Sequence, residues 1–534
     1  GPFHDYYPCP LPDGDLAFIS TRCTARVFCF RGASAVLFRM APDGSDLRPL
    51  SFSSLSEWAP SVMNDGRIIW TRWEYIDKGA DFTQTLWATN PDGTRPELVF
   101  GNTIIQPNGY ASGREVPGTQ EIACTLVSHF GDINGPIALL DLSKGRFNPA
   151  AITSITPEVP WPGMWPRTEC FRDPYPISRD LFLVSHAAED RFGLYVIDRY
   201  GNREILHLDP VYGSMGPIPL APRPLPPIIP DAVAGQAEET GRFVLMDVYR
   251  GLGEDVERGS VKWLRVVEEV RHNLHMDPNR DHEDFVKWYA SPVDVVSGPY
   301  GWPTYVAKAP LGLVPVDEDG SASFTAPAGK VLYFQALDED LNEIQRMRSM
   351  VHLQPGEARS CIGCHEDRVE APPVTQAEAM FRSPVEMQTP EWGGEPFSYE
   401  RIVQPVWDAN CVSCHNESHP KGLDLRGDLN AERVPTSYRT LITRGLVHYL
   451  DCGWNSGGCE KLSPLSFGTL KSPLWSVLNA GHQEVALSRD EMARVKTWID
   501  LNCPLWPDYI ERQSRPLGPD QPSHATLPGE AGPA

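Results

Sequence analysis

The sequence predicts a mainly β protein whose C-terminal part is mostly helical, and three observations support this fold class. Short apolar strands joined by Asp-Gly turns recur roughly every fifty residues up to about residue 215. Further strand-like segments lie between residues 240 and 350. Beyond them, Ser488-Arg489-Asp490-Glu491 is a capping box, and Met492, Val495 and Ile499 form one apolar stripe behind it, as on one face of a helix.

The N-terminal repeat consists of two interleaved elements. A turn followed by an apolar strand occurs at Asp13-Gly14 and again at Asp65-Gly66, and a strand that ends in a turn occurs at Asp43-Gly44 and at Asp92-Gly93. A period of forty to fifty residues with several strands per unit is typical of a β-propeller, and a stacked β-sandwich is the alternative. We predict a β-propeller over residues 1–215. Because four units are clear, a closed ring needs further blades from degenerate segments or from sequence missing at the N-terminus.

The rest of the chain divides by composition. Residues 216–239 are predicted to be a linker, because their first part is so rich in proline that it favours a stiff, extended backbone. Residues 240–350 are predicted to form a central β module. Residues 351–515 form the mostly helical C-terminal domain, and residues 516–534, rich in Pro and Gly, are predicted to be a disordered tail.

Two copies of Cys-x-x-Cys-His lie in the C-terminal domain, as Cys361-Ile362-Gly363-Cys364-His365 and Cys411-Val412-Ser413-Cys414-His415. Two thiols at this spacing can reach both vinyl groups of one porphyrin, and the adjoining His can then offer its imidazole to the iron. A redox dithiol does not need the following His. A zinc ribbon also uses paired Cys-x-x-Cys, but two intact copies with His in the same place favour haem. The motifs therefore predict two covalently bound haem c groups, with His365 and His415 as iron ligands.

The two predicted haems differ in their distal ligands. For the second haem, His482 is the first choice, because it lies in the turn before the capped helix; His419, His448 and Met492 are rivals, and a surface His is the alternative. Residues 366–373 after the first motif contain no His, Met or Tyr. We therefore expect the first haem to be open on one side unless a ligand comes from the propeller.

Chemically active residues also lie at the strand ends of the repeat. Cys124 and His129 lie in the third unit, Arg72 in the second, and Arg22 and His186 at corresponding strand ends of the first and fourth. If these ends line one rim, they gather a thiolate, imidazoles and guanidinium groups over a haem. Arg72, His129 and His186 are thus candidate catalytic residues, and Cys124 is a candidate zinc ligand. The alternative is a buried or disulfide-bonded Cys124.

Charge and hydropathy restrict the partners and the location. The net charge is −23 over 534 residues, which argues against nucleic acid as a partner. A negative charge would steer a basic electron-transfer protein towards the chain. The solubility of an exported protein alone also explains this charge. No apolar run reaches the length of a membrane span. Because haem c is attached outside the cytoplasm, we expect a periplasmic or otherwise exported protein whose export signal was removed.

The remaining cysteines are expected to include disulfides. Of the 12 cysteines, those outside the haem motifs would lie in an oxidising compartment. Cys452 and Cys459 flank a Gly-rich loop that a bridge would close, so we predict that they pair. Cys23 and Cys29 are similarly close.

Several longer stretches resemble the hydrazine synthase alpha subunit family and its dihaem relatives. They are residues 65–75, 171–176, 354–366 and 497–502. The resemblance implies a propeller joined to a dihaem domain, with one haem as a reaction site facing the propeller and the other as a bis-His electron relay. It also implies a first haem whose motif His binds zinc and whose iron takes a Tyr four residues later. Here that position is Val369, so His365 is kept as the iron ligand.

The sequence thus predicts a dihaem oxidoreductase. The first haem binds a small substrate, which the resemblance implies to be nitrogenous, and the second exchanges electrons with a soluble redox partner. The resemblance also implies a complex with other subunits. One alternative is a non-catalytic electron-transfer cytochrome whose propeller docks a partner, and another is a dihaem peroxidase. An enzyme needs an open iron site at the first haem, whereas a pure relay prefers two strong ligands there.

Overall fold

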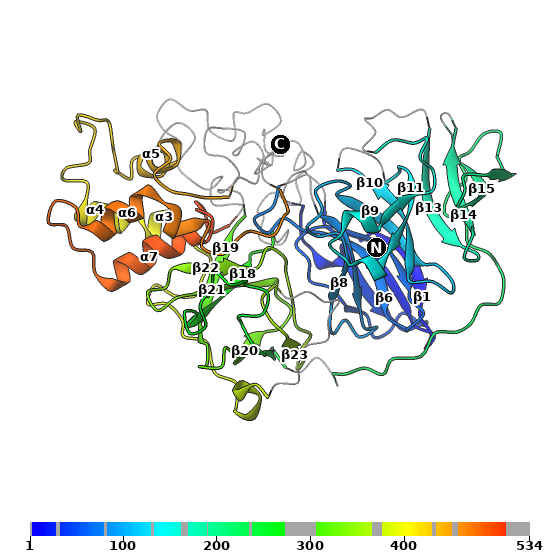
Figure 1. Cartoon of the computed structure of the whole chain (residues 1–534), viewed down its shortest axis with the longest axis horizontal. Coiled ribbons are helices and arrows are strands. Elements are labelled where there is room, and N and C mark those ends of the chain that lie inside the picture. The colour runs from blue at the N-terminus through cyan, green and yellow to red at the C-terminus, as the bar shows by residue number, and fades with distance from the viewer. Residues whose placement is uncertain are drawn as a thin grey trace, which may run out of the picture.

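The structure is a computed structural model that describes residues 3–27, 33–79, 83–129, 133–161, 169–188, 191–233, 238–272, 306–365, 376–429, 434–450 and 458–508. It confirms the mainly β class, since strands run from β1 to β23 while the described α-helices, α3 to α7, all lie between Tyr399 and Asp500. Figure 1 shows the N-terminal sheets on the right, the middle sheets below the centre and the helices on the left.

Four antiparallel units of four strands follow one another at the N-terminal side. Their strands are β1 (Asp5–Pro10), β2 (Leu16–Ser20), β3 (Val36–Met40) and β4 (Arg48–Pro49); β5 (Glu57–Val62), β6 (Ile68–Trp73), β7 (Gln84–Thr89) and β8 (Glu97–Phe100); β9 (Gly109–Glu115), β10 (Glu121–Val127), β11 (Ile137–Asp141) and β12 (Ile152–Ser154); and β13 (Cys170–Pro176), β14 (Leu181–Ala187), β15 (Gly193–Asp198) and β16 (Arg203–His207). The second and third units join where Gln84 pairs with Gly109. The described strands form these blade-like units in series and not a closed ring.

The first strand of each unit bends at the same place. Tyr7, Ala59, Ser112 and Asp173 have left-handed backbones, with φ between 53° and 56°. The register of each first strand shifts around this residue, as at a β-bulge. The first strands also pack against one another, β1 on β5, β5 on β9 and β9 on β13. The four units therefore share a bulge in the first strand as well as their turns, and these first strands lie next to one another.

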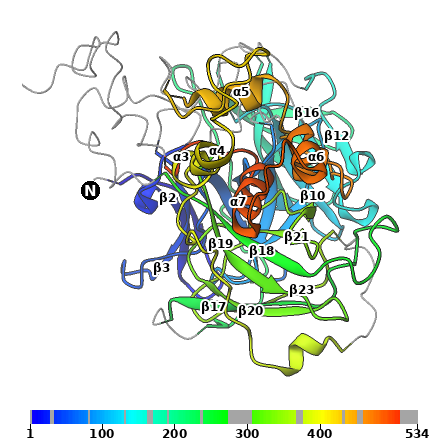
Figure 2. The same cartoon turned by 90° about the vertical axis from the view of Figure 1, so that its left-hand side faces the viewer.

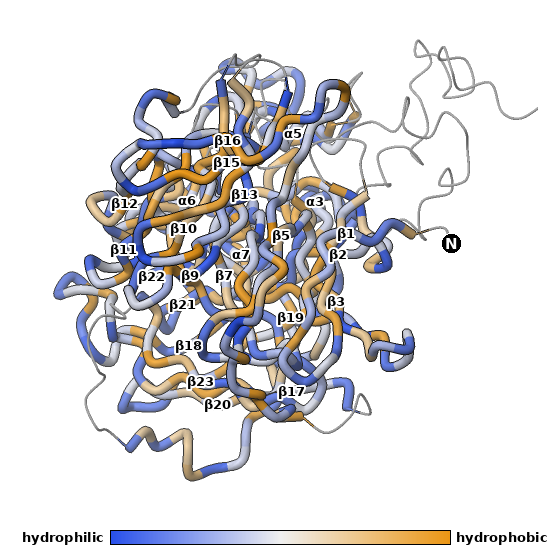
Figure 3. The backbone as a smooth tube through the Cα atoms, turned by 90° about the vertical axis from the view of Figure 1, so that its right-hand side faces the viewer, coloured by the Kyte–Doolittle hydropathy of each residue, from blue (hydrophilic) through white to orange (hydrophobic). Residues whose placement is uncertain are grey.

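Apolar side chains fill the space between successive units. Ile19 and Leu37 of the first unit pack with Trp70 and Trp87 of the second, and all four are buried. Figure 3 shows hydrophobic stretches along the strands and hydrophilic residues at many of the turns between them. This alternation of buried strands and polar turns is what makes the repeat visible in the sequence.

The Pro-rich segment packs across the turns of the first two units. A Cβ atom on Gly66 would lie 2.3 Å from the carbonyl oxygen of Pro227, so only glycine admits this close approach. Asp231 pairs with Arg39 at 3.3 Å and with Arg48 at 2.9 Å. In Figure 1 the segment runs around the outside of the molecule from the fourth unit towards the middle sheets.

Two sheets form the middle of the molecule. One has the order β20 (Ala322–Pro327), β17 (Thr240–Leu245), β23 (Ala358–Cys361), and the other has the order β19 (Lys308–Pro315), β18 (Trp263–Glu269), β21 (Leu332–Leu337), β22 (Glu343–Arg346). Phe243, Phe324 and Phe334 meet between the sheets, with ring centres 5.1–5.7 Å apart. Strand β23 runs parallel to β17 and ends at Cys361, so this sheet presents the first haem motif at its edge.

The helices gather over the middle sheets, as Figure 2 shows. They are α3 (Tyr399–Ile402), α4 (Gln404–Asn410), α5 (Thr436–Thr443), α6 (Pro473–Ala480) and α7 (Arg489–Asp500). Ser488 and Glu491 form the predicted capping box of α7. Tyr399, Tyr438 and Trp498 form the aromatic centre of this part, with ring centres 4.9–5.8 Å apart.

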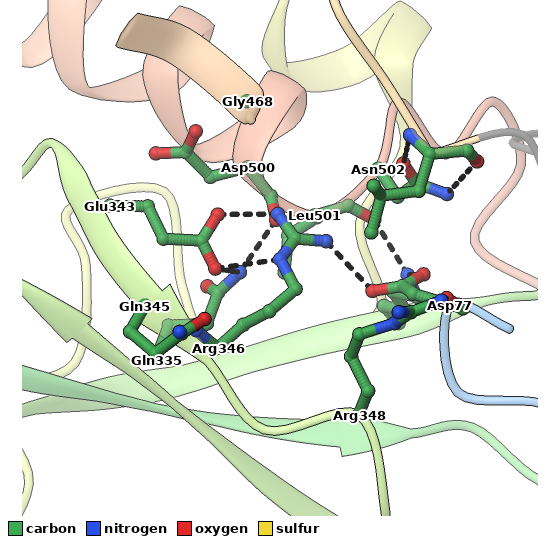
Figure 4. Close-up of polar contacts among 12 residues, drawn as sticks. Asp77, Gln335, Glu343, Gln345, Arg346, Arg348, Gly468, Asp500, Leu501 and Asn502 are labelled. Atoms are coloured by element: carbon green, nitrogen blue, oxygen red, sulfur yellow. Dashed lines mark hydrogen bonds and ion pairs between the residues drawn. The ribbon is translucent and has the colours of Figure 1, made fainter. Parts of the chain in front are cut away.

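A buried ion network joins the three parts of the molecule (Figure 4). The guanidinium of Arg346 on β22 donates to Glu343 at 2.8 Å, to Asp77 of the second unit at 2.8 Å and to the carbonyl oxygen of Asp500 at 2.7 Å. Lys308 on β19 also pairs with Asp77. These five residues are at most 4% exposed, so their charges must be balanced inside the protein.

The predicted disulfides are wrong for the cysteines that the structure describes. Cys459 is a buried thiol in a cavity wall near Lys78, and the thiol of Cys23 faces the carbonyl oxygen of Ser34 at 3.2 Å. Both side chains point into the protein, and neither forms a bridge; their predicted partners, Cys452 and Cys29, lie outside the described residues. Within the described part of the chain, the structure has no helix whose length and hydropathy suit a membrane span.

Candidate functional site

The first haem motif is held by backbone contacts with the segment after β17. Met246 donates its backbone N–H to the carbonyl oxygen of Cys361 at 2.8 Å, and His365 donates to that of Arg250 at 3.3 Å. A Cβ atom on Gly363 would lie 2.5 Å from the Cβ of Arg250, so the motif needs glycine here to pass this segment. The sheet thereby fixes both cysteines and the histidine.

Cys361, Cys364 and His365 lie on the wall of a cavity of about 450 Å³. The middle sheets supply an apolar part of the wall, made of Phe243, Leu245, Leu264, Phe324, Phe334, Ala336 and Val351. The second and third N-terminal units, the residues around β22 and strand β23 supply a more polar part, which includes Lys78, Asn102, Thr103, Arg146, Arg346, Arg348 and Arg359. The cavity therefore lies between the middle sheets and the blade-like units.

The residues present fit a covalently bound haem. The apolar wall suits a porphyrin, two thiols suit its vinyl groups, and the cationic side chains suit its propionates. Burial lowers the pKa of His365 to about 4, so its imidazole is neutral and able to bind a metal. Its Nε2 atom lies 3.2 Å from the carbonyl oxygen of Arg346, so Nε2 carries the proton in this contact and Nδ1 holds the lone pair.

The second haem motif continues helix α4. Cys411 and Val412 donate their backbone N–H groups to the carbonyl oxygen of Trp407 at 2.8 and 3.0 Å, and His415 donates to that of Cys411 at 2.8 Å. This helical turn brings the motif thiols and imidazole together. Partly buried apolar side chains pack beside it on the aromatic core, namely Cys411, Val412, Leu446, Leu474, Leu478 and Leu487.

Two of the four candidate distal ligands lie next to His415. The ring centre of His482 is 5.8 Å from that of His415, and the ring of His419 stacks on it at 4.6 Å. Face-to-face stacking leaves no room for an iron between His415 and His419, and the Nδ1 of His419 accepts two backbone N–H groups at 3.3 Å. His448 accepts the N–H of Gly468 at 3.2 Å. The arrangement favours His482.

Four of the five residues predicted at the propeller rim were candidate catalytic or zinc-binding residues, and they lie in different surroundings. Cys124 is fully buried among apolar side chains, which raises the pKa of its thiol. His129 lies against Trp73, with ring centres 5.3 Å apart, and burial lowers its pKa to about 4. No three His, Cys, Asp or Glu side chains gather as metal ligands within the described ranges, so the zinc ion stays a prediction.

Arg72 and His186 are also held in place by other side chains. Arg72 is fully buried, pairs with Glu74 and stacks on Trp87 at 3.3 Å from the ring centre. His186 stacks on Phe171 at 4.2 Å in the fourth unit. Trp87 lines the cavity, so Arg72 supports the wall from behind.

Sequence reasoning missed three cavity residues, Lys78, Arg346 and Cys459. Lys78 and Cys459 are almost fully buried, and burial lowers the pKa of Lys78 to about 8. None belongs to a recognisable motif, and each comes from a different part of the chain. Val369, at the position of the family's Tyr, lies outside the described residues.

Fold and site together define a mainly β protein with blade-like sheets, a haem motif on a cavity wall and a second haem motif among helices. Residues 259–366 match the model of the hydrazine synthase alpha subunit middle domain. The middle part of the chain is therefore similar to the hydrazine synthase alpha subunit, as the sequence resemblance predicted.

The solved structure of hydrazine synthase from Kuenenia stuttgartiensis has a similar fold, with a TM-score of 0.70 at 17% sequence identity over 92% of this chain and 77% of that one. TolB from Acinetobacter baumannii matches with a TM-score of 0.26 at 12% identity, over 37% of this chain and 41% of that one. The tricorn protease matches with a TM-score of 0.27 at 14% identity, over 39% of this chain and 19% of that one. A comparison with curated protein sequences finds no match.

Proposed function

We propose that the protein is a dihaem c-type oxidoreductase that binds a small substrate at its first haem. The observation that carries this proposal is the cavity of about 450 Å³ that holds Cys361, Cys364 and His365 on its wall. The cavity extends from the motif to the N-terminal sheets, which supports a space for substrate beside a bound haem. The similarity in fold to a hydrazine synthase supports a small nitrogenous substrate.

The residues of the first site would share the work as follows. Cys361 and Cys364 would hold the haem, which when bound supplies an iron that changes oxidation state and can bind a small ligand. His365 would bind the iron from one side through the ring nitrogen that carries no proton. The aromatic side chains between the middle sheets would exclude water, which strengthens every electrostatic interaction inside the cavity.

The second site would relay electrons. Cys411 and Cys414 would hold the haem, and His415 and His482 would bind its iron from both sides. Two strong ligands keep the geometry of an iron constant, which suits electron transfer and closes the iron to substrates. We propose a periplasmic or otherwise exported protein that exchanges electrons with a soluble redox partner in a complex with other subunits, and whose blade-like units belong to a propeller.

One observation favours a second candidate function, a non-catalytic electron-transfer cytochrome. Met347 lies on the same cavity wall as His365, and a thioether can bind haem iron. Such a ligand would close the first iron. A Met347→Ala variant that turned a low-spin first haem into a high-spin one would support the relay.

The attachment of two haems can be tested by denaturing mass spectrometry. We expect protein expressed with a haem-attachment system to gain two haem masses. A variant with Cys361→Ser and Cys364→Ser and a variant with Cys411→Ser and Cys414→Ser should gain one each, because each motif supplies both thioether bonds. The two variants serve as controls for one another. An apoprotein mass for the unmodified chain would refute the proposed function.

A further inference from the structure

We propose that the cavity beside the first haem motif binds a small anion and that Lys78 is the side chain that holds it. This inference rests on the proposed function and adds the chemical class of the ligand. Two independent observations carry it, the charge of the cavity wall and the contacts of Lys78.

The cavity wall is rich in positive charge, although the whole chain has a net charge of −23. Its cationic side chains are Lys78, Arg146, Arg346, Arg348, Arg359 and Lys461, and its carboxylates are Glu97 and Glu460. Cations therefore outnumber carboxylates six to two on this wall.

Neighbouring groups balance part of this excess. The charge of Arg346 is balanced by Glu343 and Asp77 behind the wall. Glu97 also pairs with Arg67, which does not line the cavity. By number, the six cations would still exceed the two carboxylates of the wall and the two propionates of a bound haem together, which favours an additional anion.

Lys78 is a buried cation whose hydrogen bonds are incomplete. It lies in the loop after β6, is 2% exposed, and donates to the carbonyl oxygen of Asn102 at 3.3 Å. Its charge lies 3.8 Å from an oxygen of Glu74, beyond hydrogen-bond distance. An ammonium has three N–H donors, and within the described part of the chain the Lys78 ammonium makes this one hydrogen bond.

Glu74 is already occupied by other donors. Both of its oxygens accept from the hydroxyl of Ser349, at 3.0 and 2.9 Å, and one accepts from the N–H of Met350 at 3.2 Å. Arg72 pairs with the same carboxylate and balances its charge. Lys78 is therefore a buried cation on a cavity wall with donors to spare, and a bound anion would satisfy them at a site shielded from water.

The consequence is a preference among small ligands. An anion of the size of nitrite gains from the Lys78 charge, a cation such as ammonium loses, and neutral carbon monoxide is unaffected. Comparing these three ligands distinguishes an effect of the Lys78 charge from a change in how easily a ligand reaches the iron.

The experiment uses the full-length protein with both haems attached. Sodium nitrite is titrated into the oxidised protein, and binding is followed by the absorption band of the first haem. We expect Lys78→Met to weaken nitrite binding by tenfold or more and Lys78→Arg to keep the affinity within about threefold, because the charge remains. Lys330→Met, which removes an exposed lysine paired with Glu268, is the matched control and should change nothing.

The pH dependence gives a second measurement. Glu74, Cys459, Arg348 and Arg72 are the charged and titratable groups that act on Lys78, whose pKa burial lowers to about 8. Lys78 loses its proton as the pH rises through this value, so the advantage of the wild type over Lys78→Met should shrink above about pH 8. With Lys78→Arg the advantage should persist, because arginine stays charged.

Carbon monoxide binding to the reduced protein distinguishes the possible failures. If the wild type binds no carbon monoxide, the first iron is closed and the proposed function fails. If carbon monoxide binds but nitrite affinity is the same in wild type and Lys78→Met, the anion site is refuted while the open haem stands. If Lys78→Met loses haem or weakens both ligands equally, Lys78 serves the haem propionates or the fold, and the anion site is again refuted.

Discussion

Replacing Arg346 by methionine is expected to destabilise the protein by about 3–5 kcal/mol, the usual cost of breaking a buried ion pair. The guanidinium is 1% exposed and balances Glu343 and Asp77, which are equally buried. Methionine fills much of the side-chain volume but leaves both carboxyl groups without this partner. Burial already raises the pKa of Glu343 to about 7, so without Arg346 it should take up a proton. Urea unfolding followed by circular dichroism measures the loss.

Two variants show whether the loss comes from the network. Arg203→Met removes a guanidinium that pairs with Glu158 on the surface, 2.8 Å away and 37% exposed, and should cost less than about 1 kcal/mol. Arg346→Lys keeps the charge but loses the two-pronged contact with Glu343, so its stability should lie between that of Arg346→Met and the wild type. If Arg346→Met is as stable as Arg203→Met, the network does not hold the three parts together.

Replacing His482 by alanine is expected to convert the second haem from low-spin to high-spin. His482 lies in the turn before α7, and its ring centre is 5.8 Å from that of His415. Removing it leaves the iron with one strong ligand, while the first haem, held on the separate middle sheet, should be unchanged. The absorption spectrum of the oxidised protein and its electron paramagnetic resonance measure the change.

His419→Ala is the matched control, because it removes the other imidazole beside His415. The ring of His419 stacks on His415 at 4.6 Å, and its Nδ1 accepts backbone N–H groups, so we expect the second haem to stay low-spin. The reverse result, a high-spin haem in His419→Ala and a low-spin haem in His482→Ala, would assign the distal position to His419.

The fold was predictable where a local pattern repeats. Turns before apolar strands, which are Asp-Gly in the first two units, indicated the N-terminal units, and the capping box at Ser488 indicated helix α7. The bulges at Tyr7, Ala59 and Asp173 were missed, although each precedes a proline in a first strand. These residues share a left-handed backbone conformation. The residue types at these positions indicate it only when the four units are aligned with one another.

The site was predictable where it is contiguous in sequence. The residues of the two attachment motifs can be identified from the sequence alone. The cavity, in contrast, is built from side chains hundreds of residues apart, such as Lys78, Arg346 and Cys459. Strand-end register suggested that Cys124 and His129 face a haem, but equal register does not decide which face of a strand is buried. In the structure Cys124 faces an apolar core between strands.

The account is tested most directly by the electron paramagnetic resonance spectrum of the oxidised protein, which reports the spin state of each iron. With one haem open in the cavity and the other bound by His415 and His482, we expect one high-spin and one low-spin signal in equal amounts. Two low-spin signals would contradict the central claim, because an iron with two strong ligands at Cys361 and Cys364 leaves no place for a substrate.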